Sequence, residues 1–200
     1  MLAPQHEVVA SPQVRPHPEG TSPSYYWNSC LFLAWIKDEE RQTGDMDGVR
    51  EVIERVKRRD AKIITSVLTI TEVLESKPPA GMKTLIDGLM RRVERVGMEI
   101  KVARMAHDLR DYYIQRATEF GGKTIAVPDA IHLATAILYR ANEFHTFDNG
   151  GIGKSLGLLP LSGNVGGHRL TICKPQAKNP QLDLRKPKPG TTTPSNPEPS

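Results

Sequence analysis

The sequence predicts an α/β protein whose mainly parallel central sheet is covered by helices on both faces. Short segments rich in β-forming residues alternate with helices that carry an apolar stripe, and this alternation is typical of parallel sheets. In residues 127–148, apolar residues at i, i+3, i+4 and i+7 spacing mark a helix, and a short strand follows it. The helix begins, and the strand ends, at an acidic residue, as expected at the carboxyl edge of a parallel sheet.

The composition fits one globular domain. The chain has 200 residues and 38% are hydrophobic, which is enough for one core and requires no second domain. No apolar run is long enough to cross a membrane, and the amino terminus lacks the basic-then-apolar order of a secretory signal, so we expect a cytoplasmic protein. Cys30 and Cys173 are the two cysteines, and without a Cys-x-x-Cys motif they indicate neither a disulfide framework nor a zinc site.

Both ends of the chain are rich in proline and lack an apolar period. Residues 1–23 contain five prolines, and residues 174–200 contain seven. Such segments bury too little apolar surface to offset their ordering entropy, so we expect a disordered leader (1–23), a folded domain (24–173) and a disordered tail (174–200). The net charge of +4 is weak support for nucleic-acid binding, because the tail carries five Lys and Arg against two acids.

Within residues 24–173 each element is predicted from its own pattern. Clusters of β-forming residues predict strands at residues 25–27, 62–68, 98–102, 143–147 and 169–173. Apolar residues at helical spacing predict helices at residues 30–36, 49–56, 69–76, 82–93, 105–116 and 127–141. Pro128 suits the first turn of the last helix because that position needs no amide donor.

Four oxygen-bearing side chains stand beside predicted strand ends or helix starts. Asn28 follows the first strand, and Glu72 lies in the first turn of the helix after the second strand. Asp129 opens the last helix, and Asp148 follows the strand after it. If the strands are parallel, their carboxyl ends meet at one edge of the sheet, so all four side chains can converge.

Each of the four also has a purely structural interpretation. Thr69 and Glu72 match a capping box, in which the Glu side chain reaches back to the N-cap amide. Asn28 is a strong N-cap residue, and Asp148 precedes a turn-forming Asn-Gly-Gly. Asp129 is placed in the first helical turn, where the helix dipole favours the ionised carboxylate. Taken alone, each residue fits its structural interpretation, but the placement of all four beside strand ends or helix starts favours a functional site.

Carboxylates drawn together repel one another unless a cation neutralises them. For oxygen ligands the usual cation is Mg²⁺ or Mn²⁺. Such a site suits phosphodiester hydrolysis, because a bound metal lowers the pKa of water and stabilises charge on the attacked phosphate. The histidines are scattered along the sequence. His132 follows Asp129 by three positions and could flank the site, although a hydrogen-bonded surface role is the commoner one for histidine.

A family resemblance rests on four motifs: Tyr25-Tyr26-Trp27-Asn28-Ser29-Cys30, Thr71-Glu72-Val73, Pro128-Asp129-Ala130-Ile131-His132-Leu133-Ala134-Thr135-Ala136 and His145-Thr146-Phe147-Asp148. Over residues 24–173 the chain resembles the PIN-domain family, and most of all its bacterial VapC-type toxin ribonucleases. The resemblance implies a three-layer PIN-like fold and a Mg²⁺ or Mn²⁺ site that hydrolyses RNA. Glu72, Asp129 and Asp148 would be metal-binding and catalytic acids, with Ser29 and Thr146 as polar neighbours. It also implies a homodimer and an inhibitory antitoxin protein that covers the acids.

Asn28 departs from the family pattern, in which the first acid is Asp. An amide oxygen can bind a cation but adds no charge, so both metal affinity and activity should fall. Three explanations stay open: deliberate inactivation, a natural pseudo-enzyme, or a site that tolerates the amide. Asp and Asn are nearly isosteric and the other three acids are intact, which favours the first explanation.

Two other functions compete with the nuclease. Residues 148–155 end in Gly-Lys-Ser after a strand, like a phosphate-binding loop, but such a loop requires Gly where Asp148 stands. The chain could instead bind RNA or an antitoxin without cutting RNA. The basic clusters at residues 55–59 and 91–95 could contact phosphates, although such clusters are more often solvated helix faces.

Overall fold

The computed structural model describes residues 22–37, 39, 41, 44–74, 82–150, 153 and 155–178. Residues 1–21 of the predicted leader and residues 179–200 of the predicted tail lie outside the described residues, so their disorder stays a prediction. Five strands form one sheet: β1 (Ser24–Trp27), β2 (Lys62–Ser66), β3 (Val93–Val96), β4 (Glu143–His145) and β5 (Ile172–Cys173).

The strand order is β3-β2-β1-β4-β5, and every pair of neighbouring strands is parallel. Tyr26 at the centre of β1 pairs with Ile64 on one side and with Phe144 on the other. The chain builds outward from β1 to β3 and then returns to place β4 on the other side of β1. The sheet therefore has its topological switch point between β1 and β4, where α/β proteins form their ligand crevice.

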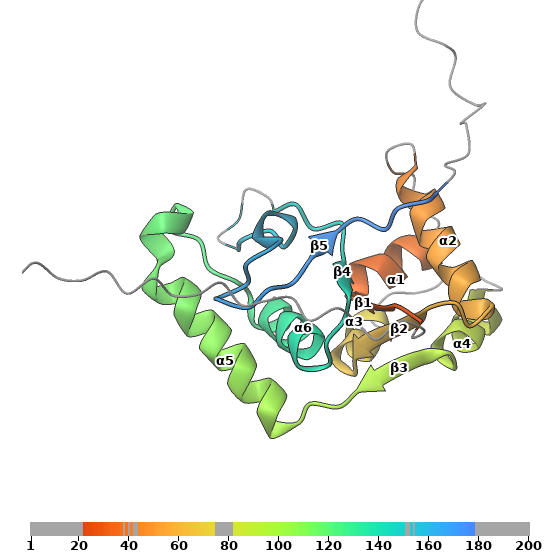
Figure 1. The fold of residues 1–200 in the computed structure, drawn as a ribbon, viewed down its shortest axis with the longest axis horizontal. Helices are drawn as coiled ribbons and strands as arrows, with labels where there is room; N and C mark the ends of the chain where they lie inside the picture. Colours follow the sequence, from red (N-terminus) through yellow and green to blue (C-terminus); the bar gives the residue numbers. More distant parts are fainter. Residues whose placement is uncertain are drawn as a thin grey trace, which may run out of the picture.

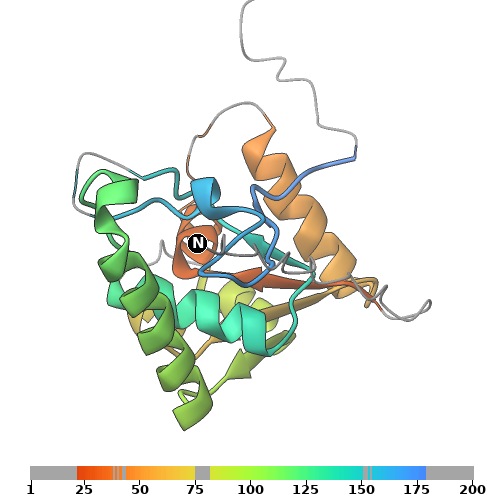
Figure 2. The same ribbon diagram turned by 60° about the vertical axis from the view of Figure 1, so that its left-hand side comes forward.

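Helices cover both faces of the sheet, which confirms the predicted three-layer α/β class (Figure 1). They are α1 (Ser29–Ile36), α2 (Asp45–Lys57), α3 (Leu68–Leu74), α4 (Met82–Met90), α5 (Ile100–Gln115) and α6 (Val127–Leu138), with 3₁₀ turns η1 (Ala117–Phe120) and η2 (Leu159–Leu161). Side chains of α5 and α6 pack on one face, and those of α1, α2 and α4 pack on the other. Figure 2 shows α5 crossing beside α6 on its side of the sheet.

Alternation along β1 explains the two cores. Tyr26 points into the core of α5 and α6, where its ring stacks on Phe144 at 5.0 Å between centroids. Tyr25 and Trp27 point into the core of α1 and α2. All three side chains are buried. Because both faces of β1 are covered, this strand reads as a continuous apolar run.

The third strand is not where the sequence pattern placed it. The prediction put a strand at residues 98–102 and extended the preceding helix to residue 93, but α4 ends at Met90 and β3 occupies Val93–Val96. β3 is an edge strand whose two middle residues, Glu94 and Arg95, are exposed. Charged residues are ordinary on an edge strand, so β3 lacks the apolar run that identifies a central one.

The remaining elements lie close to their predicted positions, with shifts at their ends. α2 begins at Asp45 and α5 at Ile100, each several residues before its predicted start. No helix among the described parts of the chain is long and apolar enough to cross a bilayer. The chain stays packed against α2 beyond residue 173, since Lys174 Nζ lies 2.9 Å from a carboxylate oxygen of Asp45.

Candidate functional site

Asn28 lies at the switch point, directly after β1, and is only 5% exposed. Its backbone is extended and occupies the N-cap position of α1, but its side chain makes no capping hydrogen bond. Instead, Nδ2 donates to Thr146 Oγ1 at 3.1 Å, and Oδ1 accepts from the Cys30 thiol at 2.9 Å. The N-cap interpretation is therefore right for the backbone and wrong for the side chain, which points toward the end of β4.

Asp148 follows β4 and organises the loop after it. Oδ1 accepts from the Gly150 amide at 2.9 Å, and Oδ2 accepts from the Leu158 amide at 3.1 Å. The Asp148 amide donates to Thr146 Oγ1 at 3.0 Å, so Thr146 links Asp148 to Asn28. The predicted turn chemistry is present, and each carboxylate oxygen keeps a second lone pair for another partner.

The phosphate-loop alternative fails in this segment. A phosphate-binding loop of that type leads directly into a helix whose first amides face the phosphates. Here Ser155 forms an isolated bridge with Thr124, and the chain continues to the short η2 turn. Residues 151, 152 and 154 of the motif lie outside the described chain.

Asp129 lies in the first turn of α6 and is partly exposed. Burial, and then the nearby charges of Asp148 and Glu72, raise its pKa to about 6 against the opposing effect of His132. Desolvation and like charges therefore oppose the effect of the helix dipole, and Asp129 ionises less readily than an ordinary aspartate.

Glu72 lies within α3 and is not part of a capping box. Thr69, the expected N-cap, lies inside the helix, where its hydroxyl is buried and forms a hydrogen bond to the Thr65 hydroxyl at 2.7 Å. Glu72 Oε2 instead lies 3.0 Å from His132 Nε2. Burial opposes ionisation of Glu72, but the hydrogen bonds from His132 and Ser29 outweigh it and lower the pKa of the carboxyl group.

His132 is the residue that the sequence pattern undervalued. It is 1% exposed, its Nε2 faces Glu72, and its Nδ1 lies 2.7 Å from the Tyr26 hydroxyl. The expected surface role is wrong. The spacing from Asp129 placed His132 on the same helix, but only the fold brings it to a carboxylate 60 residues away.

The four predicted side chains form a donor set that fits a hard divalent cation. Glu72, Asp129, Asp148 and Asn28 offer oxygen ligands only, which Mg²⁺ and Mn²⁺ prefer. The repulsion that raises the pKa of Asp129 is what such a cation would relieve. The three carboxylates do not bring one oxygen each within 4.8 Å of one another. Asp148 instead accepts hydrogen bonds from loop amides, and Glu72 forms a hydrogen bond with His132.

A second cluster lies on the other face of the sheet. One ligand atom each from Glu143, His145 and Cys173 lies within 4.8 Å of the others. The Trp27 indole donates to His145 Nδ1 at 3.1 Å, and an indole N–H can only donate, so the proton of the neutral ring is on Nε2. His145 Nε2 lies 2.7 Å from Glu143 Oε2, so this proton is donated to Glu143. His145 Nε2, the nitrogen that faces the cluster, therefore already donates a hydrogen bond to Glu143.

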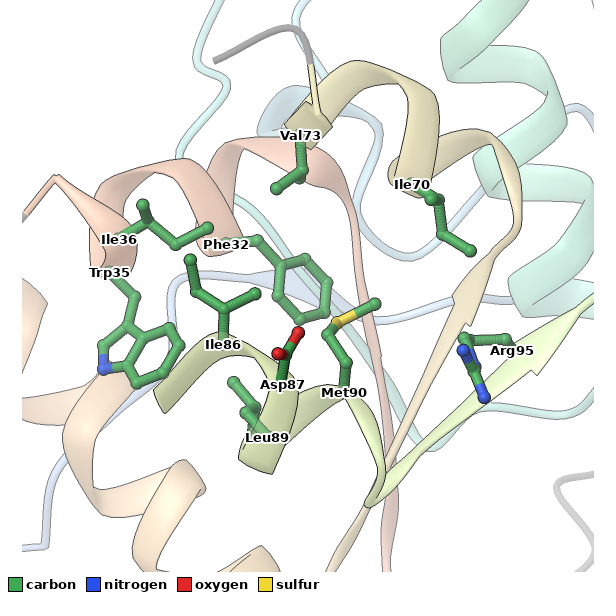
Figure 3. A pocket seen from close by; sticks show the side chains of 10 residues that line it. All are labelled: Phe32, Trp35, Ile36, Ile70, Val73, Ile86, Asp87, Leu89, Met90 and Arg95. Carbon is green, nitrogen blue, oxygen red and sulfur yellow. The ribbon is translucent and has the colours of Figure 1, made fainter. Parts of the chain in front are cut away.

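A separate apolar hollow of about 180 Å³ opens between α1, α3, α4 and β3 (Figure 3). Ile70 and Val73 of α3 face it across from Phe32 of α1 and Ile86 of α4. None of the four predicted site residues lines it. Since Glu72 contacts His132, α3 contributes to the acidic site as well as to the hollow.

No protein-family model matches the sequence, and neither does any curated protein. The fold is similar to VapBC2 from Rickettsia felis bound to a promoter DNA fragment, at 19% identity over 63% of this chain and 88% of that chain, with a TM-score of 0.48. DNA-bound VapBC from Salmonella typhimurium is 13% identical over 75% and 98% of the two chains, with a TM-score of 0.48. A toxin–antitoxin complex from Klebsiella pneumoniae is 19% identical over 66% and 95%, with a TM-score of 0.42.

The chain is similar to solved VapBC structures. At these identities and TM-scores the similarity concerns the arrangement of strands and helices, and it assigns no role to an individual residue.

Proposed function

We propose that the chain is a Mg²⁺- or Mn²⁺-dependent endoribonuclease of the toxin-like PIN type, weakened by Asn28. The single observation that carries the proposal is that Thr146 joins Asn28 to Asp148 by hydrogen bonds where the fold has its switch point. Three acids from α3, α6 and the end of β4 influence one another beside the switch point of a parallel sheet. Such a group is costly for the fold, and hydrolysis of a phosphodiester is a function that would justify it.

Each side chain has a role that follows from its contacts. Glu72, Asp129 and Asp148 would hold the cation, which when bound supplies an activated water and neutralises charge on the phosphate. Thr146 orients Asn28 and Asp148, since its hydroxyl oxygen accepts hydrogen bonds from Asn28 Nδ2 and from the Asp148 amide. His132 donates to Glu72 and keeps that carboxylate ionised.

Asn28 would contribute only an amide oxygen, and the Cys30 thiol already donates to that atom. Replacing Asn28 by Asp adds one negative charge without changing the shape of the side chain. We expect the Asn28→Asp variant to bind Mn²⁺ about tenfold more tightly or better, in the range that single supporting groups contribute at metal sites.

The test is Mn²⁺-dependent cleavage of total RNA by the chain and by its Asn28→Asp variant, with Mn²⁺ affinity measured by calorimetry. Asp129→Asn in the Asn28→Asp background is the matched control, because it changes one carboxylate into an amide at the same site. We expect higher activity in Asn28→Asp and loss of activity in the double variant. Equal activity of the chain and of Asn28→Asp would contradict the role given to Asn28.

A catalytically impaired module that binds RNA or an antitoxin is the second candidate. The hydrogen bonding of the Asn28 amide favours it, because the nitrogen and the oxygen of that side chain each have a partner without a metal. The first basic cluster supports it little, since Arg55 donates to the Tyr25 hydroxyl, Lys57 pairs with Glu54 and Arg58 pairs with Asp60. Salt-dependent RNA binding with no cleavage by Asn28→Asp would favour this candidate.

The partners belong to the same proposal. We infer an RNA substrate, an antitoxin protein and a homodimer acting in the cytoplasm. Light scattering coupled to size-exclusion chromatography measures the oligomeric state, and a monomer at micromolar concentration would contradict the homodimer.

A further inference from the structure

A buried chain of hydrogen bonds joins four elements and ends at the candidate metal site. It begins at the Ser66 amide of β2, which donates to the Tyr26 hydroxyl of β1 at 3.0 Å. That hydroxyl lies 2.7 Å from His132 Nδ1 of α6, and His132 Nε2 lies 3.0 Å from Glu72 Oε2 of α3. Tyr26 and His132 are 0% and 1% exposed.

The chemistry of the end groups gives the direction of these bonds. A glutamate is a carboxylate at neutral pH and can only accept, so the 3.0 Å contact between His132 Nε2 and Glu72 Oε2 requires a proton on Nε2. In the neutral ring, Nδ1 then accepts from the Tyr26 hydroxyl. The ring is held at both nitrogens, and its orientation is fixed by a residue at the centre of the sheet.

We propose that His132 is a positioning residue that holds Glu72 in place to bind the metal, with Tyr26 fixing the ring. The inference rests on the proposed function and deepens it. Glu72 lies on a short helix and is partly exposed, so without this bond its side chain would sample several rotamers. Ordering a glutamate side chain costs rotamer entropy, and a hydrogen bond that forms before the metal binds removes that cost from metal binding.

The two nitrogens of His132 can be replaced separately. In His132→Gln the side-chain amide reaches about as far as Nε2 and keeps a donor for Glu72. In His132→Asn the shorter amide stays near the position of Nδ1, keeps a partner for Tyr26 and loses Glu72. Both variants remove the ring and its packing, so a purely structural role would affect them alike.

The fold supplies a control of the same kind. His145 is also buried, also donates from Nε2 to a glutamate and also accepts at Nδ1, but it faces the core of α1 and α2. His145→Gln therefore removes the ring of a buried His–Glu pair that does not contact Glu72. It also replaces the imidazole nitrogen of the Glu143, His145 and Cys173 cluster by an amide nitrogen, which is a poor metal ligand.

The experiment is Mn²⁺ calorimetry on each variant in the full chain and in the Asn28→Asp background, with thermal unfolding as a check of folding. We expect His132→Asn to weaken Mn²⁺ binding about tenfold or more, as loss of an outer-shell partner does. His132→Gln and His145→Gln should stay close to the parent. Equal affinity of His132→Asn and its parent would overturn the positioning role, as would an equal loss in His145→Gln.

A metal-free measurement separates this inference from the proposed function. Long-range ¹⁵N NMR of the histidine rings in the unsubstituted chain reports which nitrogen of His132 is protonated. A proton on Nε2 is expected, and an unprotonated Nε2 would overturn the inference without reference to metal. If Nε2 is protonated but neither the chain nor Asn28→Asp binds Mn²⁺, the proposed metal site fails instead.

Discussion

The carboxyl group of Asp129 illustrates how a site residue can work against the stability of its own fold. Burial and two neighbouring acids raise its folded-state pKa from 3.8 to about 6. The folded protein therefore binds this proton more tightly than the unfolded chain does. Through Asp129, stability is highest below about pH 4 and is lost as the pH rises through 6, because the buried group must then ionise.

We expect Asp129→Asn to increase the free energy of unfolding at pH 7 by on the order of 1 kcal/mol, after allowance for solvent screening of a partly exposed group. The gain should shrink as the pH falls and vanish at about pH 3, below the unfolded pKa of 3.8, where Asp129 is protonated in both states. Urea unfolding at the two pH values measures this. Asp148→Asn is the contrasting variant, because both oxygens of Asp148 accept backbone amides and its loss should destabilise the protein. A less stable Asp129→Asn would contradict the assignment.

Among the helices, α2 has a feature that only the structure explains. A Cβ at Gly48 would lie 2.0 Å from the Pro175 carbonyl oxygen. The segment at residues 174–178 is held there by the Lys174–Asp45 ion pair and by the Lys178 amide, which donates to Glu51 Oε2 at 2.7 Å. Glycine is therefore required for this close approach, in spite of its cost in a helix.

Gly48→Ala should lower the melting temperature, with overpacking costing about 1–3 kcal/mol in excess of the gain in helix propensity. Hydrogen exchange of the Lys178 amide should become faster as the segment moves away. Gly88→Ala in α4 is the control, since nothing lies within 4 Å of its added Cβ, and it should raise the melting temperature. If Gly48→Ala behaves like Gly88→Ala, the packing of residues 174–178 on α2 is wrong.

How far the sequence predicts an element depends on what identifies it. The helix at α6 carries its own signals, with Pro128 in the first turn and an apolar face, and it begins where expected. β3 carries exposed charges and was misplaced by several residues. The His132–Glu72 contact has no local signal at all, because it joins residues 60 apart whose proximity is a property of the sheet topology.

At the scale of the whole molecule, alternating strands and helices were sufficient to predict parallel strands, and parallel strands were sufficient to bring Asn28 and Thr146 together. The roles within the site were less accessible. Capping and turn patterns describe the backbone and the local partners of Asn28 and Asp148. They do not show the second partner of each side chain, which is Thr146 for Asn28 and Leu158 for Asp148.

The whole fold should respond to the metal. A ligand that binds only the folded state at one hundred times its Kd stabilises it by about 2.7 kcal/mol, or roughly 5–10 °C in melting temperature for a domain of this size. We expect Mn²⁺ to give such a shift in the Asn28→Asp variant, a smaller one in the unsubstituted chain, and EDTA to reverse both. No shift in Asn28→Asp at millimolar Mn²⁺ would contradict the metal site.

The two faces of α3 have a thermodynamic consequence. Ile70 and Val73 line the apolar hollow, and Glu72 between them contacts His132. A molecule that rotates or shifts this short helix when it fills the hollow would change the cation affinity of the acidic site, and the cation would change the affinity of that molecule by the same factor. Residues 70–73 of α3 would then couple the apolar hollow to the acidic site, so that their ligands compete or cooperate although neither ligand contacts both sites.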